Sequence, residues 1–155
     1  MNVLRALRAI SLKRASMVGI AVAATSAATL ALAPTAGATS TNIDTWSSFW
    51  QPCGTYMCLY YSPNLTNASW TPSGTSDSDL SGNKFANHGT GSAGAGLVVR
   101  NNAASMGNNT VNCHVTAFYS PGFKGDSNWL HAGRAGNLTS GLRNNEASIR
   151  VDSCT

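Results

Sequence analysis

This 155-residue chain has four cysteines, which could form disulfides or bind a metal. Cys53 and Cys58 are close neighbours, whereas Cys113 and Cys154 lie far apart in the sequence. Three pairings into two disulfides are open. We favour Cys53 with Cys58 and Cys113 with Cys154. The second bond would join the strand expected just after Cys113 to the strand expected just before Cys154. A zinc site at Cys53 and Cys58 is the alternative, which an oxidising compartment disfavours.

The histidines do not assemble a catalytic motif with the acids. His88, His114 and His131 lack the spacing of metal ligands, and neither His-Glu-x-x-His nor Gly-x-Ser-x-Gly occurs. We interpret His114 as a strand residue rather than a general base. The sequence therefore predicts that the protein is not an enzyme and has no catalytic residues.

Residues 1–38 have the three regions of a secretory signal peptide. A basic start is followed by an apolar, Ala-rich run and by the small-x-small sequence Ala36-Gly37-Ala38. The basic residues are Arg5, Arg8, Lys13 and Arg14. An uncleaved membrane anchor is the alternative. Cleavage after Ala38 predicts a secreted, extracellular protein that is not attached to a membrane.

Removal of this segment changes the charge balance. The chain has 10 Lys and Arg against 6 Asp and Glu, and four of the basic residues lie in the signal, so the exported part carries six of each sign. A neutral chain offers no electrostatic reason to bind nucleic acid or an anionic membrane. The remaining length supports one domain, and we expect a monomer.

Two phrases of sequence each occur twice, which indicates one supersecondary unit used two times. The clearer copy comprises residues 118–125 and 143–148, and the weaker copy comprises residues 60–67 and 100–105. In each copy an aromatic residue is followed by Ser-Pro and then by Gly125 or Asn67, residue types that tolerate positive φ. The pattern predicts a hairpin that folds over in each repeat.

Further strands follow from runs of apolar residues and from alternation. The clearest are residues 114–119 and 148–152, where Ile149 and Val151 share one face. Shorter candidates are residues 57–61, 85–86 and 97–99. The Gly-, Ser- and Asn-rich stretch between the two phrases of the first copy predicts an exposed loop.

Residues 39–52 form an N-terminal arm ahead of these strands. Its aromatic residues Trp46, Phe49 and Trp50 are spaced as on one turn of helix. The alternative is a loose arm that lies across the fold. In either case we expect the aromatic residues to pack against the protein rather than to bind a partner.

The spacing aromatic-x4-Phe-x-Gly, with Asn-Asn-x-x-Ser further along, resembles the Greek-key motif of βγ-crystallins. Cys53-x4-Cys58, which leads directly into residues 59–64, is similar to the small secreted actinobacterial proteins of peptidase inhibitor family I36. The resemblance implies an all-β sandwich of two Greek keys, stapled by disulfides. The domain would span residues 53–155, with one Greek key over about 53–110 and the other over about 111–155.

The resemblance to family I36 also implies a function. The protein would inhibit a secreted peptidase, metallopeptidases included, by inserting a rigid loop into the active-site cleft. Candidate loops are Thr71 to Gly96 and the tip from Asn128 to Arg134. A calcium-binding structural or stress protein and a killer-toxin-like antimicrobial protein are the alternatives on this fold. No cofactor is required.

Calcium is the one ion that the resemblance implies. In βγ-crystallins, paired loops of the form Asn/Asp-Asn/Asp-x-x-Ser/Thr-Ser supply oxygen ligands to it. The resemblance places candidate calcium ligands at Asn101, Asn102, Ser105, Asn144, Asn145 and Ser148. The sixth positions are Met106 and Ile149 and every acidic position is Asn, which lowers the expected affinity. The alternative is that each Asn pair forms a turn and each Ser ties the fold-over hairpin down.

Overall fold

The computed structural model describes residues 37–46, 56–87 and 90–155, which belong to one compact unit. The described residues contain β-strands and two short 3-10 turns but no α-helix, so the all-β prediction is confirmed. Residues 1–36 of the predicted signal peptide lie outside the described residues, as do Phe49, Trp50, Cys53 and His88.

Each repeat provides four strands. The first provides β2 (Met57–Ser62), β3 (Thr66–Trp70), β4 (Ser76–Asp77) and β5 (Ser105–Asn108). The second provides β6 (His114–Ser120), β7 (Lys124–Leu130), β8 (Ala135–Asn137) and β9 (Ser148–Asp152). Outside this set lie β1 (Ser40–Asn42) and the 3-10 turns η1 (Pro63–Leu65) and η2 (Leu80–Gly82).

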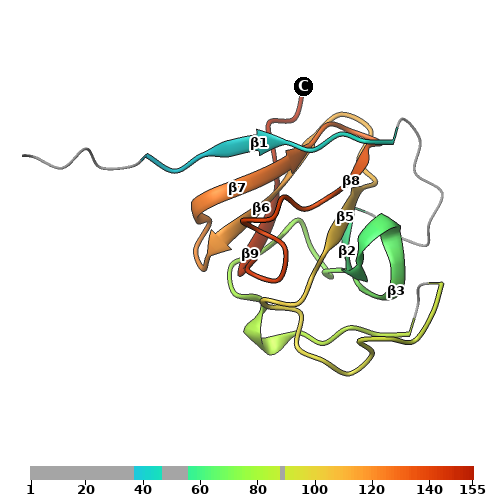
Figure 1. Ribbon diagram of the computed structural model, residues 1–155. Helices are drawn as coiled ribbons and strands as arrows, with labels where there is room; N and C mark the ends of the chain where they lie inside the picture. The colour runs from blue at the N-terminus through green and yellow to red at the C-terminus, as the bar shows by residue number, and fades with distance from the viewer. Residues whose placement is uncertain (1–36, 47–55, 88–89) are drawn as a thin grey trace, which may run out of the picture. The chain divides into compact units, whose positions relative to one another are not determined.

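The strands form two sheets (Figure 1). The five-stranded sheet has the order β1-β7-β6-β9-β4, and the four-stranded sheet has the order β3-β2-β5-β8. Within each repeat, the first, second and fourth strands lie in one sheet, and the third strand lies in the other. Thus Ser76 of β4 pairs with Arg150 of β9, and Asn137 of β8 pairs with Ser105 of β5. The two repeats are therefore interlocked by main-chain hydrogen bonds.

Apolar side chains from both sheets meet in one core. Alternation along the second repeat buries Val115, Ala117 and Ile149 completely, as the sequence predicts for an antiparallel sheet with one buried face. From the first repeat the core takes Met57, Leu59 and Met106. The opposite face of β9 carries Arg150, whose side chain is 42% exposed. One face of the five-stranded sheet is thus left available for polar groups.

The described part of the arm, residues 39–46, is extended rather than helical. In Figure 1 β1 runs alongside β7, with which it pairs in parallel, and Trp46 then bridges to Ala135 beside the other sheet. Ile43 lies between these points and is buried in the core. A Cβ at Gly136 would collide with the carbonyl oxygen of Ile43, so the arm can lie this close only against glycine.

The predicted disulfide between Cys113 and Cys154 is present, with a sequence separation of 41 residues. By the chain-entropy argument, a bond that closes such a loop contributes about 4 kcal/mol to stability. Cys58 is disulfide-bonded as well, which removes it as a thiolate ligand for zinc. Its predicted partner, Cys53, lies outside the described residues.

Two short strands predicted in the first repeat are absent as strands. Residues 85–86 and 97–99 contribute isolated bridges only, Ala86 to Ser69 and Val98 to Lys84. The main-chain hydrogen bonds of these residues do not extend into a ladder, because the surrounding Gly- and Ser-rich chain has few side chains to pack in a sheet.

Candidate functional site

The two fold-over hairpins have the same backbone conformation. In the first repeat Asn64, Leu65 and Asn67 have positive φ, and in the second Gly122, Phe123 and Gly125 do. The match is position for position, as the repeat predicts. Positive φ is ordinary for glycine and tolerable for asparagine, but for Leu65 (φ 58°) and Phe123 (φ 63°) it is strained.

One serine in each repeat holds this strained residue. Ser105 Oγ donates to the carbonyl oxygen of Ser62 (2.7 Å) and accepts from the N–H of Leu65 (3.1 Å). Ser148 Oγ makes the same pair of bonds, to Ser120 (2.7 Å) and from Phe123 (3.1 Å). Both serines are completely buried. We call each of these arrangements a serine lock, and both confirm that the serines tie the hairpins down.

The Asn-Asn phrases of the two repeats contact each other. The N–H of Asn101 donates to the carbonyl oxygen of Glu146 (2.8 Å), and that of Asn144 donates to the carbonyl oxygen of Ala103 (2.9 Å). The side-chain amides of Asn102 and Asn145 donate to carbonyl oxygens within their own turns. Four of the six candidate calcium ligands, the two lock serines and these two asparagines, therefore have structural hydrogen bonds. Calcium binding stays a prediction.

Glu146, in the contact between the two Asn-Asn phrases, is an acidic residue whose burial the sequence does not predict. It occupies the position of Ala103 in the other repeat and is completely buried. Its Oε1 accepts from the N–H groups of Asn102 (3.1 Å) and Ala103 (2.8 Å), whereas Oε2 has no hydrogen-bond partner among the described residues. Burial raises the pKa of Glu146 to about 7, although the surrounding backbone N–H groups oppose the shift.

The first candidate inhibitory loop, Thr71 to Gly96, is fixed to the sandwich at its C-terminal end. Phe85 is buried and packs edge-on against Tyr61, with ring centroids 6.0 Å apart. Its N–H donates to the carbonyl oxygen of Leu97 (2.9 Å), and its carbonyl oxygen accepts from Gly96 (2.8 Å). Leu97, one residue beyond the predicted loop, is 47% exposed. The fixed backbone thus presents an apolar side chain to solvent.

The second candidate loop, Asn128 to Arg134, is only partly a loop. Its first three residues belong to β7, where Asn128 is buried and accepts from the N–H of Thr139 (2.8 Å). After β7, His131 and Arg134 both approach Asp44 of the arm, at 2.6 Å and 3.8 Å. Partial burial opposes ionisation of Asp44, but hydrogen bonds from His131 lower its pKa below the ordinary value. Because Asn128 is buried, it is unavailable to a peptidase.

The two described histidines, His114 and His131, both contact the indole of Trp129. His114 stacks on Trp129 with ring centroids 4.8 Å apart, and His131 meets the same indole edge-on at 4.7 Å. No group of three or more His, Cys, Asp or Glu side chains in the described part of the chain is arranged to hold a metal ion. No helix in that part is long and apolar enough to cross a membrane.

Comparisons with known proteins identify no relative of this chain. No protein-family model, no curated protein and no solved structure matches it.

Proposed function

We propose that the protein is a secreted peptidase inhibitor built on a βγ-crystallin-like pair of Greek keys. Two features support this fold. The third strand of each repeat lies in the sheet of the other repeat. In addition, both hairpins are held by the serine that ends an Asn-Asn-x-x-Ser phrase. A domain of this kind is a rigid carrier for the loops that connect its strands.

The observation that carries the inhibitor proposal is the exposed pair Leu97 and Val98. These side chains are 47% and 37% exposed, yet the next residue, Val99, is completely buried. The N–H of Val99 donates to the carbonyl oxygen of Asn83 (2.9 Å), and the N–H of Leu97 donates to Gly94 (3.0 Å). Apolar side chains are thus held outward on a backbone that is hydrogen-bonded within the loop.

Such a loop is suited to fill a hydrophobic specificity pocket. The N–H and carbonyl groups of Leu97 already have partners, so the peptidase would make contact mainly through the leucine side chain. Complete burial of a leucine side chain contributes roughly 1.5–3 kcal/mol. Little of this is offset by ordering the loop, because it is ordered before binding.

The experiment is an inhibition assay with a panel of secreted metallo- and serine peptidases. Residual activity of each peptidase is measured against increasing amounts of the purified protein. We expect at least one peptidase to lose activity to a saturating limit while the inhibitor stays uncleaved. Full activity of every peptidase at saturating protein, or cleavage of the protein as a substrate, would contradict the proposal.

Calcium titration distinguishes the inhibitor from a calcium-binding structural protein. The buried hydroxyls of Ser105 and Ser148 each donate one hydrogen bond to the protein and accept another from it. We therefore expect the melting temperature to stay constant on addition of millimolar calcium. A saturable rise would favour the calcium alternative, since a ligand that binds only the folded state stabilises it. Growth inhibition of yeast or bacteria would favour the antimicrobial alternative.

A further inference from the structure

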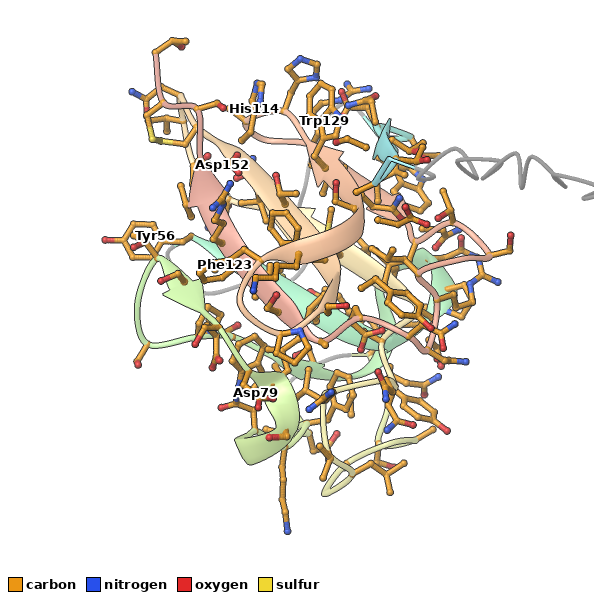
Figure 2. The ribbon with its side chains drawn as sticks, turned by 90° about the vertical axis from the view of Figure 1, so that its left-hand side faces the viewer. Tyr56, Asp79, His114, Phe123, Trp129 and Asp152 are labelled. Carbon is orange, nitrogen blue, oxygen red and sulfur yellow. A yellow bond between two sulfur atoms is a disulfide. The ribbon has the colours of Figure 1, made fainter. Side chains whose placement is uncertain are left out.

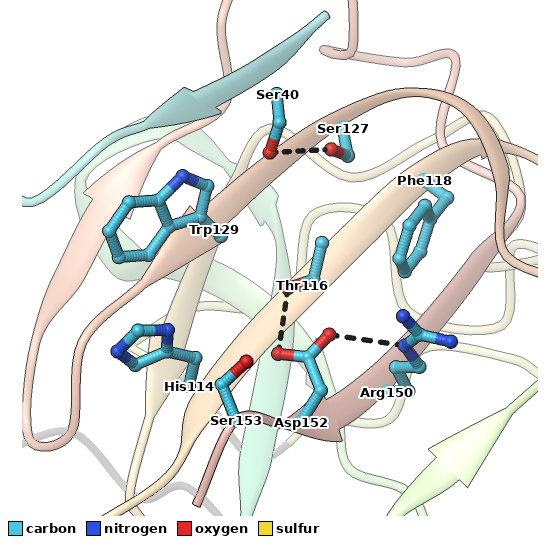
Figure 3. A pocket seen from close by; sticks show the side chains of 9 residues that line it. All are labelled: Ser40, His114, Thr116, Phe118, Ser127, Trp129, Arg150, Asp152 and Ser153. Carbon is cyan, nitrogen blue, oxygen red and sulfur yellow. Dashed lines mark hydrogen bonds and ion pairs between the residues drawn. The ribbon is translucent and has the colours of Figure 1, made fainter. Parts of the chain in front are cut away.

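A pocket of about 250 Å³ lies on the outer face of the five-stranded sheet. Its lining comes from β1, β6, β7 and β9 and from the chain end after β9 (Figure 3). None of the candidate calcium ligands lines it, and neither do Leu97 and Val98; Trp129 is the one lining residue that also belongs to a candidate inhibitory loop. Pockets for drug-sized ligands have volumes of roughly 300–1,000 Å³, so this one has room for a small ligand or for one unit of a polymer.

Aromatic rings form one end of the pocket. Trp129 and His114 lie next to each other on paired strands, with ring planes 25° apart. His131 supports both rings from outside the pocket, with centroid distances of 4.7 and 4.8 Å. In Figure 2 His114 and Trp129 lie together at one end of the molecule, with Asp152 close by. The faces of aromatic rings carry partial negative charge, which attracts the polarised C–H groups of a saturated ring.

Polar groups line the middle of the pocket. Asp152 accepts hydrogen bonds from Thr116 Oγ1 (3.2 Å) and from Arg150 Nε (3.1 Å), and its side chain is 24% exposed. Arg150 is held over the ring of Phe118 at 5.1 Å. Each carboxylate oxygen retains acceptor capacity, and the guanidinium has further N–H donors. Donors and acceptors therefore stand side by side in fixed positions.

The charge and hydroxyl content of the lining limit the class of ligand. The charges of Arg150 and Asp152 balance each other, so the pocket has no net attraction for a phosphate or for a cation. Hydroxyls of Ser40 and Ser127, joined by a 3.1 Å hydrogen bond, and of Thr116 add groups that both donate and accept. An apolar ring surface beside paired donors and acceptors matches a molecule with C–H faces and a hydroxyl rim.

We propose that this pocket binds a sugar ring of a neutral glycan. The ring lies against Trp129 and His114, and its hydroxyls bond to Asp152 and Arg150. This site is independent of peptidase inhibition, because it lies on the sheet face rather than on the Leu97 loop. It would let the protein hold a glycan while the loop stays free.

Titration with neutral oligosaccharides tests the proposal on the full purified protein. The probes are tetrasaccharides of N-acetylglucosamine, of β-linked glucose, of α-linked glucose and of mannose, with inorganic phosphate as an anionic probe. NMR follows the indole N–H signal of Trp129, identified as the signal missing from Trp129→Ala. We expect at least one tetrasaccharide to shift this signal saturably, and phosphate to leave it unchanged.

Variants show whether binding uses the pocket. Asp152→Ala should weaken the calorimetric affinity for that tetrasaccharide by about 10-fold or more, because hydrogen bonds to a charged group are lost. Tyr119→Ala removes an aromatic side chain that is 49% exposed and does not line the pocket, and should bind as the native chain does. Melting temperatures show that each variant is folded. The absence of a shift with every tetrasaccharide, a shift with phosphate alone, or unchanged affinity in folded Asp152→Ala would overturn the proposal.

Discussion

Ser105 and Ser148 each hold a bulky residue in the left-handed region of backbone space. A strained φ of this kind costs on the order of 1–3 kcal/mol and persists only where the surroundings impose it. At Phe123 the surroundings include the lock serine and the ring of Phe118, whose centroid is 5.8 Å away. The lock is thus a local source of stability on which the hairpin depends.

Ser148→Ala tests the lock. Alanine leaves the N–H of Phe123 and the carbonyl oxygen of Ser120 without the partner that both now share, so we expect a loss of about 1–3 kcal/mol in the free energy of unfolding. Thermal and denaturant melts measure it. Ser140→Ala, at an exposed position, is the matched control. Equal stability of the two variants would show that the lock contributes nothing.

Glu146 should make stability depend on pH. Its pKa of about 7 in the folded protein lies above the ordinary 4.5, so the folded state keeps a proton that the unfolded state releases between these values. Stability therefore falls as pH rises from about 4.5 to 7, by about 3 kcal/mol from this residue.

Glu146→Gln cannot ionise, and its stability should lack this part of the slope. The measurement is the free energy of unfolding of both chains at several pH values between 4 and 8. Because the other titrating groups are shared, the difference between the two curves isolates Glu146. Parallel curves would mean that the pKa of Glu146 is the same in the folded and unfolded chains.

At the residue scale the sequence predicts what depends on residue type. Positive φ at Asn67 and Gly125 follows from turn chemistry and is confirmed. Positive φ at Leu65 and Phe123 does not follow from residue type, because leucine and phenylalanine disfavour it. The lock serine that bonds to each of them is distant in the sequence. The residues next to Glu146 in the sequence do not predict its burial either. Comparison of the two repeats could have indicated it, because Glu146 occupies the position of Ala103.

Among the elements, the arm depends on one glycine of β8. Gly136→Ala would place a methyl group on the carbonyl oxygen of Ile43, and the arm must shift. Forcing an extra carbon into a packed contact costs roughly 1–3 kcal/mol. We expect a lower melting temperature and faster amide exchange in β1. Gly141→Ala has open space around the new methyl group and should keep both values; identical behaviour of the two variants would show that the arm is not held at Gly136.

Strands with regular alternation are predictable and the others are not. β6 and β9 are strands as the sequence predicts, and Val115, Ala117 and Ile149 face the core. Thr116 and Phe118 of β6, which line the outer pocket, are buried as well. The first five residues of β7, Lys124 to Asn128, include no apolar side chain and give no such signal. The exchange of third strands between sheets depends on contacts across the whole fold, and neither β4 nor β8 is long enough to reveal it in sequence.

For the whole molecule, the sequence repeat has physical consequences. The lock serines, the left-handed turns and the contact between the Asn-Asn phrases occur in pairs, so two related modules close over one core. The long connection of the first repeat breaks this symmetry, because this connection, which includes Leu97, has no counterpart in the second repeat. Function is expected where the two repeats differ.

The inhibition constant of Leu97→Ala tests the inhibitor proposal most directly. Against a peptidase that the native chain inhibits, we predict an increase of about 10-fold or more, because a leucine side chain no longer fills the specificity pocket. Val111→Ala removes a side chain that is 93% exposed and lies outside that loop, and should leave the constant unchanged. Inhibition by folded Leu97→Ala as strong as that by the native chain would contradict the account.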